Sequence, residues 1–465
     1  MKRVQNELMS LVNRGVDRHL RLAVTGLSRS GKTAFITSLV NQLLNVHSGA
    51  RLPLFSVVRE ERLLGVRRVP QRDMGTPRFT YDEGLAQLYG TPPAWPTPTR
   101  GVSEMRLALR YRTSDSLLRY FRESATLWLE IVDYPGEWLL DLPMLAQDYA
   151  GWSRQMTGLL QGERAEWAKP WRDLCADLDP LAPADENRLA QIAAAWTDYL
   201  HQCKQQGLHF IQPGRFVLPG EMAGAPALQF FPWPGVDEIN PAQLAQAGKN
   251  SNFATLQARF HYYCQHVVKG FYKEHFLRFD RQIVLVDCLQ PLNSGPQAFN
   301  DMRLALTQLM QSFHYGQRTL FRRLFSPVID KLLFAATKAD HITADQHVNM
   351  VSLLQQMVQD AWQNAAFEGI SIDCLGLASV QATESGLVDH HGEKLPALRG
   401  HRLSDGAALT FYPGEVPPRL PGNAFWQQQG FQFEAFRPQQ LDVDRPLPHI
   451  RMDAALEFLL GDKLR

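Results

Sequence analysis

The sequence predicts an α/β protein with a mixed, mostly parallel sheet of six strands, interrupted by a large helical insertion. Three observations predict this class. Short apolar runs alternate with stretches of helical periodicity, the pattern of a sheet covered by helices. The first run, RLAVT, passes at once through a glycine-rich loop into a helix. A long stretch of helical composition, residues 140–280, separates the third strand from the fourth.

The predicted strands differ in how buried their side chains are expected to be. Residues 104–112 alternate apolar and polar side chains, as a half-exposed strand does, whereas residues 125–133 end in an unbroken apolar run, as a buried strand does. The six strands are Arg21–Thr25, Glu104–Arg112, Ala125–Asp133, Arg281–Leu289, Lys331–Asp340 and Ile370–Val380. Helices are predicted from Thr33 onward, over 296–312, from Thr343 to about Phe367, and over 452–463.

At 465 residues the chain is too long for one ordinary core, so we expect several segments. They are an N-terminal amphipathic helix (1–20), a first core part (21–139) with a Pro-, Arg- and Gly-rich loop (46–101), a mainly helical insertion (140–280), a second core part (281–385) and an irregular C-terminal extension ending in a helix (386–465).

Composition excludes several classes of protein. The apolar and charged fractions of 45% and 20% are those of a globular domain, and a net charge of +1 gives no general attraction to nucleic acid. Five scattered cysteines form no CxxC pair, which argues against a disulfide framework or a thiolate zinc site.

The same reasoning bears on location. No apolar run is long enough for a transmembrane segment, and the charged N-terminus lacks the apolar core of a signal peptide. We therefore expect a cytoplasmic protein. Peripheral attachment at the inner face of the membrane stays open, because apolar residues near the N-terminus share one helical face beside basic residues. These apolar residues are Val4, Leu8, Leu11 and Val12.

A phosphate-binding loop is the strongest motif. Residues 26–33, GLSRSGKT, match G-x-x-x-x-G-K-[ST] between a strand and a helix. Such a loop turns its backbone N–H groups onto phosphates, so Ser28, Arg29, Ser30 and Gly31 are predicted phosphate-binding residues.

Two side chains at the end of this loop have separate roles. The ammonium group of Lys32 reaches the β- and γ-phosphates and is counted among the catalytic groups, whereas the hydroxyl of Thr33 is a ligand of Mg²⁺.

The second motif is VDYPGEW at residues 132–138. Asp133 ends a buried strand, where a carboxylate can hold Mg²⁺, and the bare backbone of Gly136 can approach a γ-phosphate. The tetrapeptide YPGE recurs at 412–415 without an aspartate at a strand end, so we interpret that copy as a turn.

The third motif is Thr337-Lys338-Ala339-Asp340, at the end of a predicted strand. An aspartate there can accept hydrogen bonds from two guanine N–H groups that adenine lacks, and the lysine stem can lie along the base. Further along the chain, Ser379 and Val380 close a strand where a backbone N–H can meet the guanine oxygen.

In this order, the motifs resemble the translation-factor class of P-loop GTPases. The resemblance implies binding of GTP and GDP with Mg²⁺, and a six-stranded sheet whose one antiparallel strand is 104–112. Over its whole length the chain is similar to the YcjX-like bacterial proteins, through its opening 44 residues, DYPGEW and TKADH. That resemblance implies association with the phage-shock, envelope-stress response and an inner-membrane protein as partner. The family is often described as ATPases, whereas TKAD favours guanine.

Two departures from such a GTPase pattern matter. The loop 46–101 is far longer than the usual switch I; its Mg²⁺-binding threonine is Thr97 or Thr99, and we select Thr99. Glu137 stands where many such enzymes carry a water-orienting glutamine, and an ionised glutamate can only accept hydrogen bonds. It is therefore either a catalytic residue of a slow enzyme or an acidic cap of the following helix.

Three functions remain in view. The preferred one is a slow GTPase switch whose helical insertion responds to the γ-phosphate. The second is a nucleotide-binding scaffold for a membrane partner with little hydrolysis, and the third is an ATPase. No nucleic-acid-binding motif is present in the sequence.

Overall fold

The computed structural model describes residues 17–114, 123–246, 248–314, 329–367, 369–390, 392–427, 432–443 and 445–465. These form two compact units. The first contains the chain up to Pro135, residues Phe279–Pro296 and the described chain from residue 329, and the second contains Gly136–Arg278 and the chain from Gln297 through the helix that follows.

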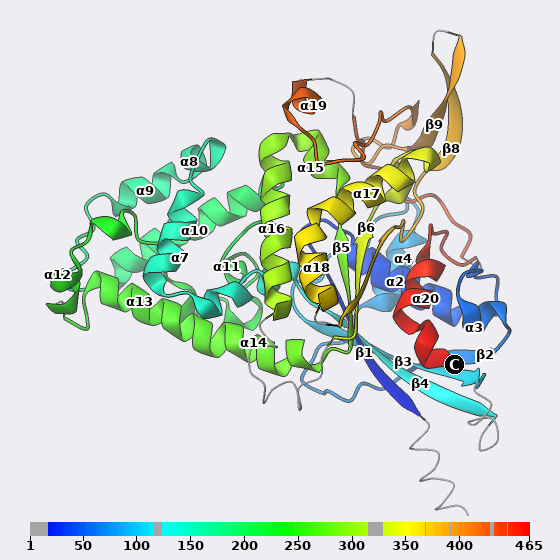
Figure 1. The fold of residues 1–465 in the computed structure, drawn as a ribbon, viewed down its shortest axis with the longest axis horizontal. Coiled ribbons are helices and arrows are strands. Elements are labelled where there is room, and N and C mark those ends of the chain that lie inside the picture. Colours follow the sequence, from blue (N-terminus) through cyan, green and yellow to red (C-terminus); the bar gives the residue numbers. More distant parts are fainter. Residues whose placement is uncertain are drawn as a thin grey trace, which may run out of the picture. The chain divides into compact units, whose positions relative to one another are not determined.

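The first unit is built on a seven-stranded sheet, in the order β2-β3-β4-β1-β5-β6-β7 (Figure 1). Neighbouring strands from β4 to β7 pair in parallel, whereas β3 pairs antiparallel with both β2 and β4. The strands are β1 Arg18–Gly26, β2 Leu63–Val69, β3 Ser103–Arg112, β4 Ser124–Asp133, β5 Arg281–Val286, β6 Lys331–Ala336 and β7 Ser371–Gly376. The predicted α/β class and the single reversed strand are confirmed. Parallel pairing brings the carboxyl ends of β1, β4, β5, β6 and β7, and the motifs that follow them, to one edge.

The predicted strand count of six is wrong, because β2 lies inside the loop 46–101. Its sequence LLGVRRV has no clean alternation, and Gly65 falls at a register shift against β3. As an edge strand it needs no continuous apolar run, and its exposed arginines are typical of edges that must not pair further. Helices α3 (Ser56–Arg59) and α4 (Tyr81–Leu88) lie in the same loop.

Helices cover the sheet of the first unit. On one side α2 (Lys32–Leu44) and the C-terminal helix α20 (Met452–Leu460) share an apolar core with β1, β3 and β4. The fully buried guanidinium of Arg281 bonds Asp330 and Asp462 at 2.6 to 3.1 Å, which ties β5 to the end of the chain. The other α-helices described in this unit are α15 Leu289–Ser294, α17 His347–Met357, α18 Gln359–Phe367 and α19 Asn423–Gln427. Helix α16, Pro296–His314, belongs to the second unit from Gln297 onward.

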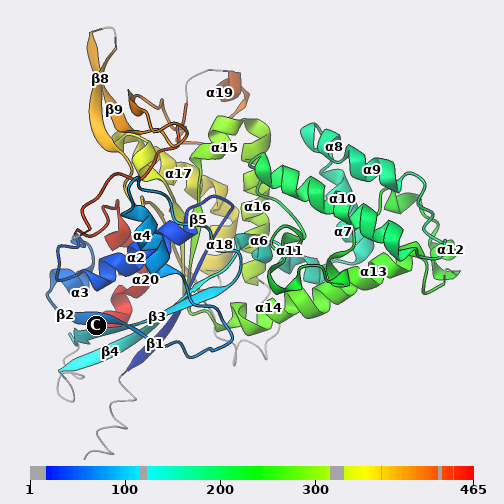
Figure 2. The ribbon, with the colours of Figure 1, turned by 180° about the vertical axis from the view of Figure 1, so that it is seen from behind.

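The C-terminal extension contains more regular structure than its sequence indicates. Strands β8 (Glu384–His390), β9 (Glu393–His401) and β10 (Ala408–Phe411) form an antiparallel sheet of three strands. Its β8–β9 hairpin projects as an arm in Figure 2. Most described side chains of the hairpin are exposed or half-buried, so no apolar alternation marks these strands in the sequence. A helix was expected over residues 1–20. Residues 1–16 of that range lie outside the described part of the chain, and residues 18–20 belong to β1.

The described part of the second unit is helical. Its helices are α6 Gly136–Leu139, α7 Tyr149–Gly158, α8 Glu163–Trp167, α9 Lys169–Cys175, α10 Glu186–Gln205, α11 Gly214–Val217, α12 Pro241–Gln246, α13 Asn252–Tyr262 and α14 Lys269–Glu274. Large aromatic side chains such as Trp152 and Phe230 fill its interior. A buried ion pair, Arg164 Nη2 to Asp301 Oδ1 at 2.5 Å, joins α8 to α16.

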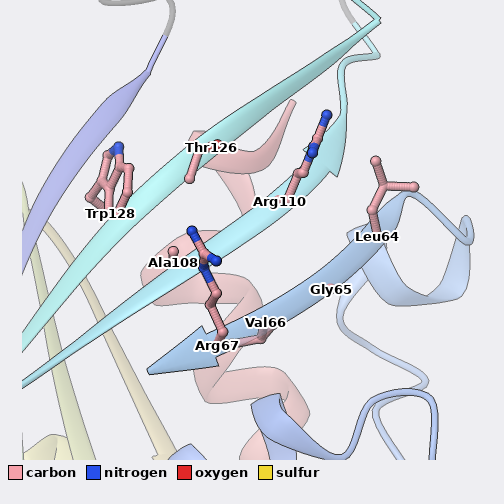
Figure 3. A pocket seen from close by; sticks show the side chains of 8 residues that line it. All are labelled: Leu64, Gly65, Val66, Arg67, Ala108, Arg110, Thr126 and Trp128. Carbon is pink, nitrogen blue, oxygen red and sulfur yellow. The ribbon is translucent and has the colours of Figure 1, made fainter. Parts of the chain in front are cut away.

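A hollow of about 450 Å³ lies over β2, β3 and β4, lined by Arg67, Arg110, Trp128 and their neighbours (Figure 3). Trp128 lies in the middle of β4 and Thr126, another lining residue, near its start, whereas Asp133 ends that strand, so the hollow is not part of the edge that carries the motifs. Within the described part of the chain, no helix combines the length and apolar character needed to cross a membrane.

Candidate functional site

The phosphate-binding loop joins β1 directly to α2. Arg29 and Gly31 adopt left-handed backbone conformations, with φ of 62° and 83°, which curl the loop around its own N–H groups. A Cβ on Gly26 would lie 2.7 Å from the carbonyl oxygen of Leu285 in β5, so only glycine fits there. The hydroxyl of Ser30 is buried and has no hydrogen-bond partner among the described residues.

Asp133 lies beside this loop because β4 pairs in parallel with β1, Val24 opposite Asp133. Its carboxylate is 1% exposed; Oδ2 accepts a hydrogen bond from the Thr99 hydroxyl, and Oδ1 has no hydrogen-bond partner in the described chain. Burial raises the pKa of Asp133 above its usual value, while the Lys32 charge and the Thr99 hydrogen bond oppose that rise. A buried carboxylate with one unused oxygen is costly unless a cation or donor meets it.

These groups fit Mg²⁺, which prefers oxygen ligands. The hydrogen bond from Thr99 to Asp133 brings two such oxygen donors together, and Asp133 Oδ1 has no partner among the described residues. Thr33, the third predicted ligand, is the second residue of α2, directly after the loop. The other threonine that the sequence left open, Thr97, exchanges two hydrogen bonds of 2.9 Å with Gln87 instead. Of the two threonines, Thr99 is therefore the one that bonds Asp133.

Gly136 and Glu137 begin the second unit, in α6. Both are buried, and Lys204 Nζ in α10 donates to Glu137 Oε1 at 2.8 Å. A Cβ on Gly214 would lie 2.3 Å from the carbonyl oxygen of Glu137, so α11 packs directly on this segment. Glu137 thus has an ion-pair partner inside the helical unit, which the sequence did not predict.

The TKAD segment follows β6. Lys338 has a left-handed backbone (φ 61°), and its Nζ donates to Asp287 Oδ2 at 2.6 Å. Burial alone would raise the pKa of Asp287, yet the Lys338 ammonium and its hydrogen bond lower that pKa below its usual value. Asp287 was not among the predicted site residues, although an aspartate directly after a buried strand, here β5, is a recognisable sequence signal.

Both carboxylate oxygens of Asp340 have protein partners. Oδ1 lies 3.0 Å from Nδ1 of His341, and Oδ2 accepts from the Ala382 N–H at 2.7 Å. Burial opposes ionisation, but the charge and hydrogen bond of His341 hold the pKa of Asp340 below its usual range. A carboxylate offers about four acceptor positions, so this pairing still leaves acceptor capacity for a base.

The last predicted base-binding residues lie in the turn after β7. Ser379 is half-buried, whereas Val380 is 3% exposed and packs with Leu88 and Leu447. The turn is fixed by reciprocal backbone hydrogen bonds between Ala378 and Ile450, so the C-terminal part of the chain positions it.

The sequence pattern of the YcjX-like family, DUF463, matches residues 20–464. This chain belongs to the YcjX-like family. It is 82% identical over 465 residues to the "Ras-like GTPase YcjX" of Escherichia coli (strain K12), covering all of both chains. It is 45% identical over 480 residues to the protein of the same name from Shewanella oneidensis, covering 100% of this chain and 98% of that one. The resemblance predicted from the P-loop, DYPGEW and TKADH is thereby confirmed.

Proposed function

We propose that this YcjX-like chain binds guanine nucleotides with Mg²⁺ and slowly hydrolyses GTP to GDP and phosphate. The observation that carries the proposal is the buried Asp133, which Thr99 bonds on one oxygen beside the P-loop and whose other oxygen has no partner among the described residues. The name "Ras-like GTPase" of two relatives supports the same activity.

The chain's own groups divide the work as follows. Backbone N–H groups of residues 28–31 bind the phosphates, and Lys32 carries its charge to the β- and γ-oxygens. Thr33, Asp133 and Thr99 are the residues that would hold Mg²⁺, which when bound neutralises charge developing on the phosphates. In this proposal the N–H of Gly136 senses the γ-phosphate, and Asp340 reads the guanine base together with the backbone at Ser379 and Val380.

Glu137 is the residue that sets the expected rate. Its carboxylate can only accept hydrogen bonds, and Lys204 already occupies it in the helical unit, 2.8 Å away. We therefore expect slow basal turnover. Glu137→Ala should change that turnover several-fold, with Glu221→Ala, an exposed glutamate of the same unit, as the control; an unchanged rate would remove Glu137 from the catalytic groups.

The switch behaviour follows from where the chain changes units. The boundary between Pro135 and Gly136 falls inside the D-x-x-G motif, so Gly136 is itself the first residue of the helical unit and of α6. In this proposal, a shift of Gly136 toward a γ-phosphate would therefore move the start of α6. We expect protease protection of residues 140–280 to differ between GDP and a non-hydrolysable GTP analogue. Identical digestion patterns would exclude such a switch.

A second candidate function is a scaffold that holds GDP or GTP with little turnover. The Lys204–Glu137 pair favours it, since it keeps the glutamate away from a water-orienting role. The partner in either case is, by family resemblance, an inner-membrane protein in the envelope-stress response, with this chain in the cytoplasm or at the inner face of the membrane.

One experiment separates these functions: dissociation constants for GTP, GDP and ATP, with turnover measured in the same buffer. Tight GTP and GDP binding with measurable hydrolysis supports the GTPase. Tight GDP binding without hydrolysis supports the scaffold, and ATP binding tighter than GTP would establish the ATPase instead.

A further inference from the structure

The C-terminal extension reaches the base-binding end of the candidate site. In the first unit, the segment from Phe433 to Phe436 lies against α15 and the TKAD residues, and its surroundings can be followed in Figures 1 and 2 by the orange-red chain near α15. The Phe433 ring centre lies 5.5 Å from Lys338 Nζ and 5.3 Å from the His341 ring centre. No feature of the sequence motifs accounts for an aromatic ring at this place.

Phe433 is held firmly although it is only partly buried. Its N–H donates to Asn293 Oδ1 at 3.2 Å, and its carbonyl oxygen accepts from Asn293 Nδ2 at 3.4 Å. Three residues on, the buried Phe436 ring packs on Gly400, where a Cβ would lie 2.7 Å from it. The segment is therefore anchored on both sides, while Phe433 itself is only half-buried.

The side chains around Phe433 indicate which kind of ligand this ring could contact. Asp340 supplies acceptors for the edge of a guanine base, and Lys338 supplies a stem for one of its faces. A planar base gains further stability when an aromatic ring stacks on it. Among the described residues, Phe433 lies beside both Lys338 and His341, the residue bonded to Asp340.

We propose that Phe433 is a base-stacking residue, which the C-terminal extension supplies to the guanine site. This inference rests on the proposed guanine-nucleotide binding. It makes the extension, and not only the GTPase core, part of the nucleotide site. It also links the site to the switch I loop, because Trp95 Nε1, four residues before Thr99, donates to the Phe436 carbonyl at 2.8 Å.

The test is GDP affinity of the full-length chain carrying Phe433→Ala, Phe433→Leu or Phe433→Trp. We expect the alanine and leucine variants to bind GDP about tenfold more weakly and the tryptophan variant to bind about as tightly as the wild type, since only the last keeps a stacking face. Phe425→Ala, a partly buried phenylalanine of the same extension, is the control and should leave GDP affinity unchanged.

The outcomes distinguish this inference from the function beneath it. If the wild-type chain binds no guanine nucleotide, the proposed function fails. If the wild type binds GDP and Phe433→Ala binds it equally well or more tightly, the ring is only a support or a cover, and the stacking role is overturned. If Phe433→Trp is as weak as Phe433→Ala while both melt at the wild-type temperature without nucleotide, stacking is likewise excluded.

Discussion

The phosphate end and the base end of the candidate site differ in how fully their polar groups are satisfied. At the phosphate end, Ser30 Oγ and Asp133 Oδ1 are buried without partners among the described residues. At the base end, both oxygens of Asp340 and the ammonium of Lys338 already bond protein groups. The polar side chains of the base end are therefore already held in place by protein groups. At the phosphate end, two buried oxygen atoms would gain hydrogen-bond or metal partners only when nucleotide and Mg²⁺ bind.

The largest expected effect is at the phosphate end. Lys32→Ala removes the charge that reaches the phosphates, so GTP turnover should fall by about 10²- to 10³-fold, as when one preorganised group is lost from a charged transition state. Steady-state phosphate release measures it. Lys249→Ala, an exposed lysine of the helical unit, is the control. Turnover within twofold of wild type in Lys32→Ala would place the chemistry elsewhere.

The next effect concerns base choice. Asp340→Asn replaces an acceptor for the guanine N–H groups, so the preference for GTP over ATP should fall by about tenfold or more, because a hydrogen bond to a charged group contributes about 1.5–3 kcal/mol. Equilibrium binding of both nucleotides measures the ratio. Asp345→Asn, on an exposed aspartate of the same loop, should leave it alone. An unchanged ratio in Asp340→Asn would show that the base end does not read guanine.

The effects on the stability of the nucleotide-free protein are smaller, but the two ends of the site should show opposite signs. Asp133→Asn removes a buried charge that lacks a full set of partners and should stabilise the free protein by about 1 kcal/mol. Asp340→Asn turns an amide toward donor groups and should destabilise it by about 1–3 kcal/mol. Thermal melts without nucleotide or Mg²⁺ compare the two. Shifts of the same sign would contradict the comparison between the ends.

The smallest expected effect is the change in the free energy of unfolding per pH unit, measured on the protein without nucleotide. Burial raises the pKa of Asp133 in the folded state, so stability falls as pH rises from the unfolded value of about 3.9 through the folded pKa. In the helical unit Asp141 acts with the same sign, since burial raises its pKa to about 7, against hydrogen bonds from Tyr263 and Gly214 and the Arg215 charge. Each group contributes at most about 1.4 kcal/mol per pH unit.

Urea unfolding between pH 5 and pH 8 measures these slopes. Asp133→Asn and Asp141→Asn should each flatten the decline of stability with pH. The pKa of Asp340 is lowered, so its contribution is complete above its unfolded pKa and is lost only as pH falls below about 3.9. Asp340→Asn should therefore leave the slope between pH 5 and pH 8 unchanged, and a flattened slope in that variant would contradict its assignment.

Local sequence pattern was sufficient to select candidate site residues. The P-loop, Asp133 and TKAD each combine a buried strand with a short spacing, and their functional roles stay predictions. Several contacts around the candidate residues join positions far apart in the chain, such as Ala382 to Asp340, Asn293 to Phe433 and Lys204 to Glu137. Local periodicity carries no signal for such pairs, nor for the hydrogen bond that joins Thr99, and not Thr97, to Asp133.

The strands that sequence missed have a common cause. β2 is an arginine-rich edge strand with a glycine at a register shift, and β8 to β10 are largely exposed. Period-two alternation appears only when one face of a strand is buried and the other is not. Strands without a buried face therefore escape prediction, whereas the central strands were found within a few residues of their observed bounds.

The chain enters the helical unit after Pro135, leaves it after Arg278 and returns to it after Pro296, where α16 contributes Asp301 to the buried pair with Arg164. The helical unit consists of two separate segments of the chain, so a single insertion in one loop could not have added all of it. Excising 136–278 would strand α16 with an unpaired buried carboxylate, and grafting the same piece elsewhere would leave Arg164 without its counterion. Any shortened form that is to keep this buried pair must therefore retain the chain through α16.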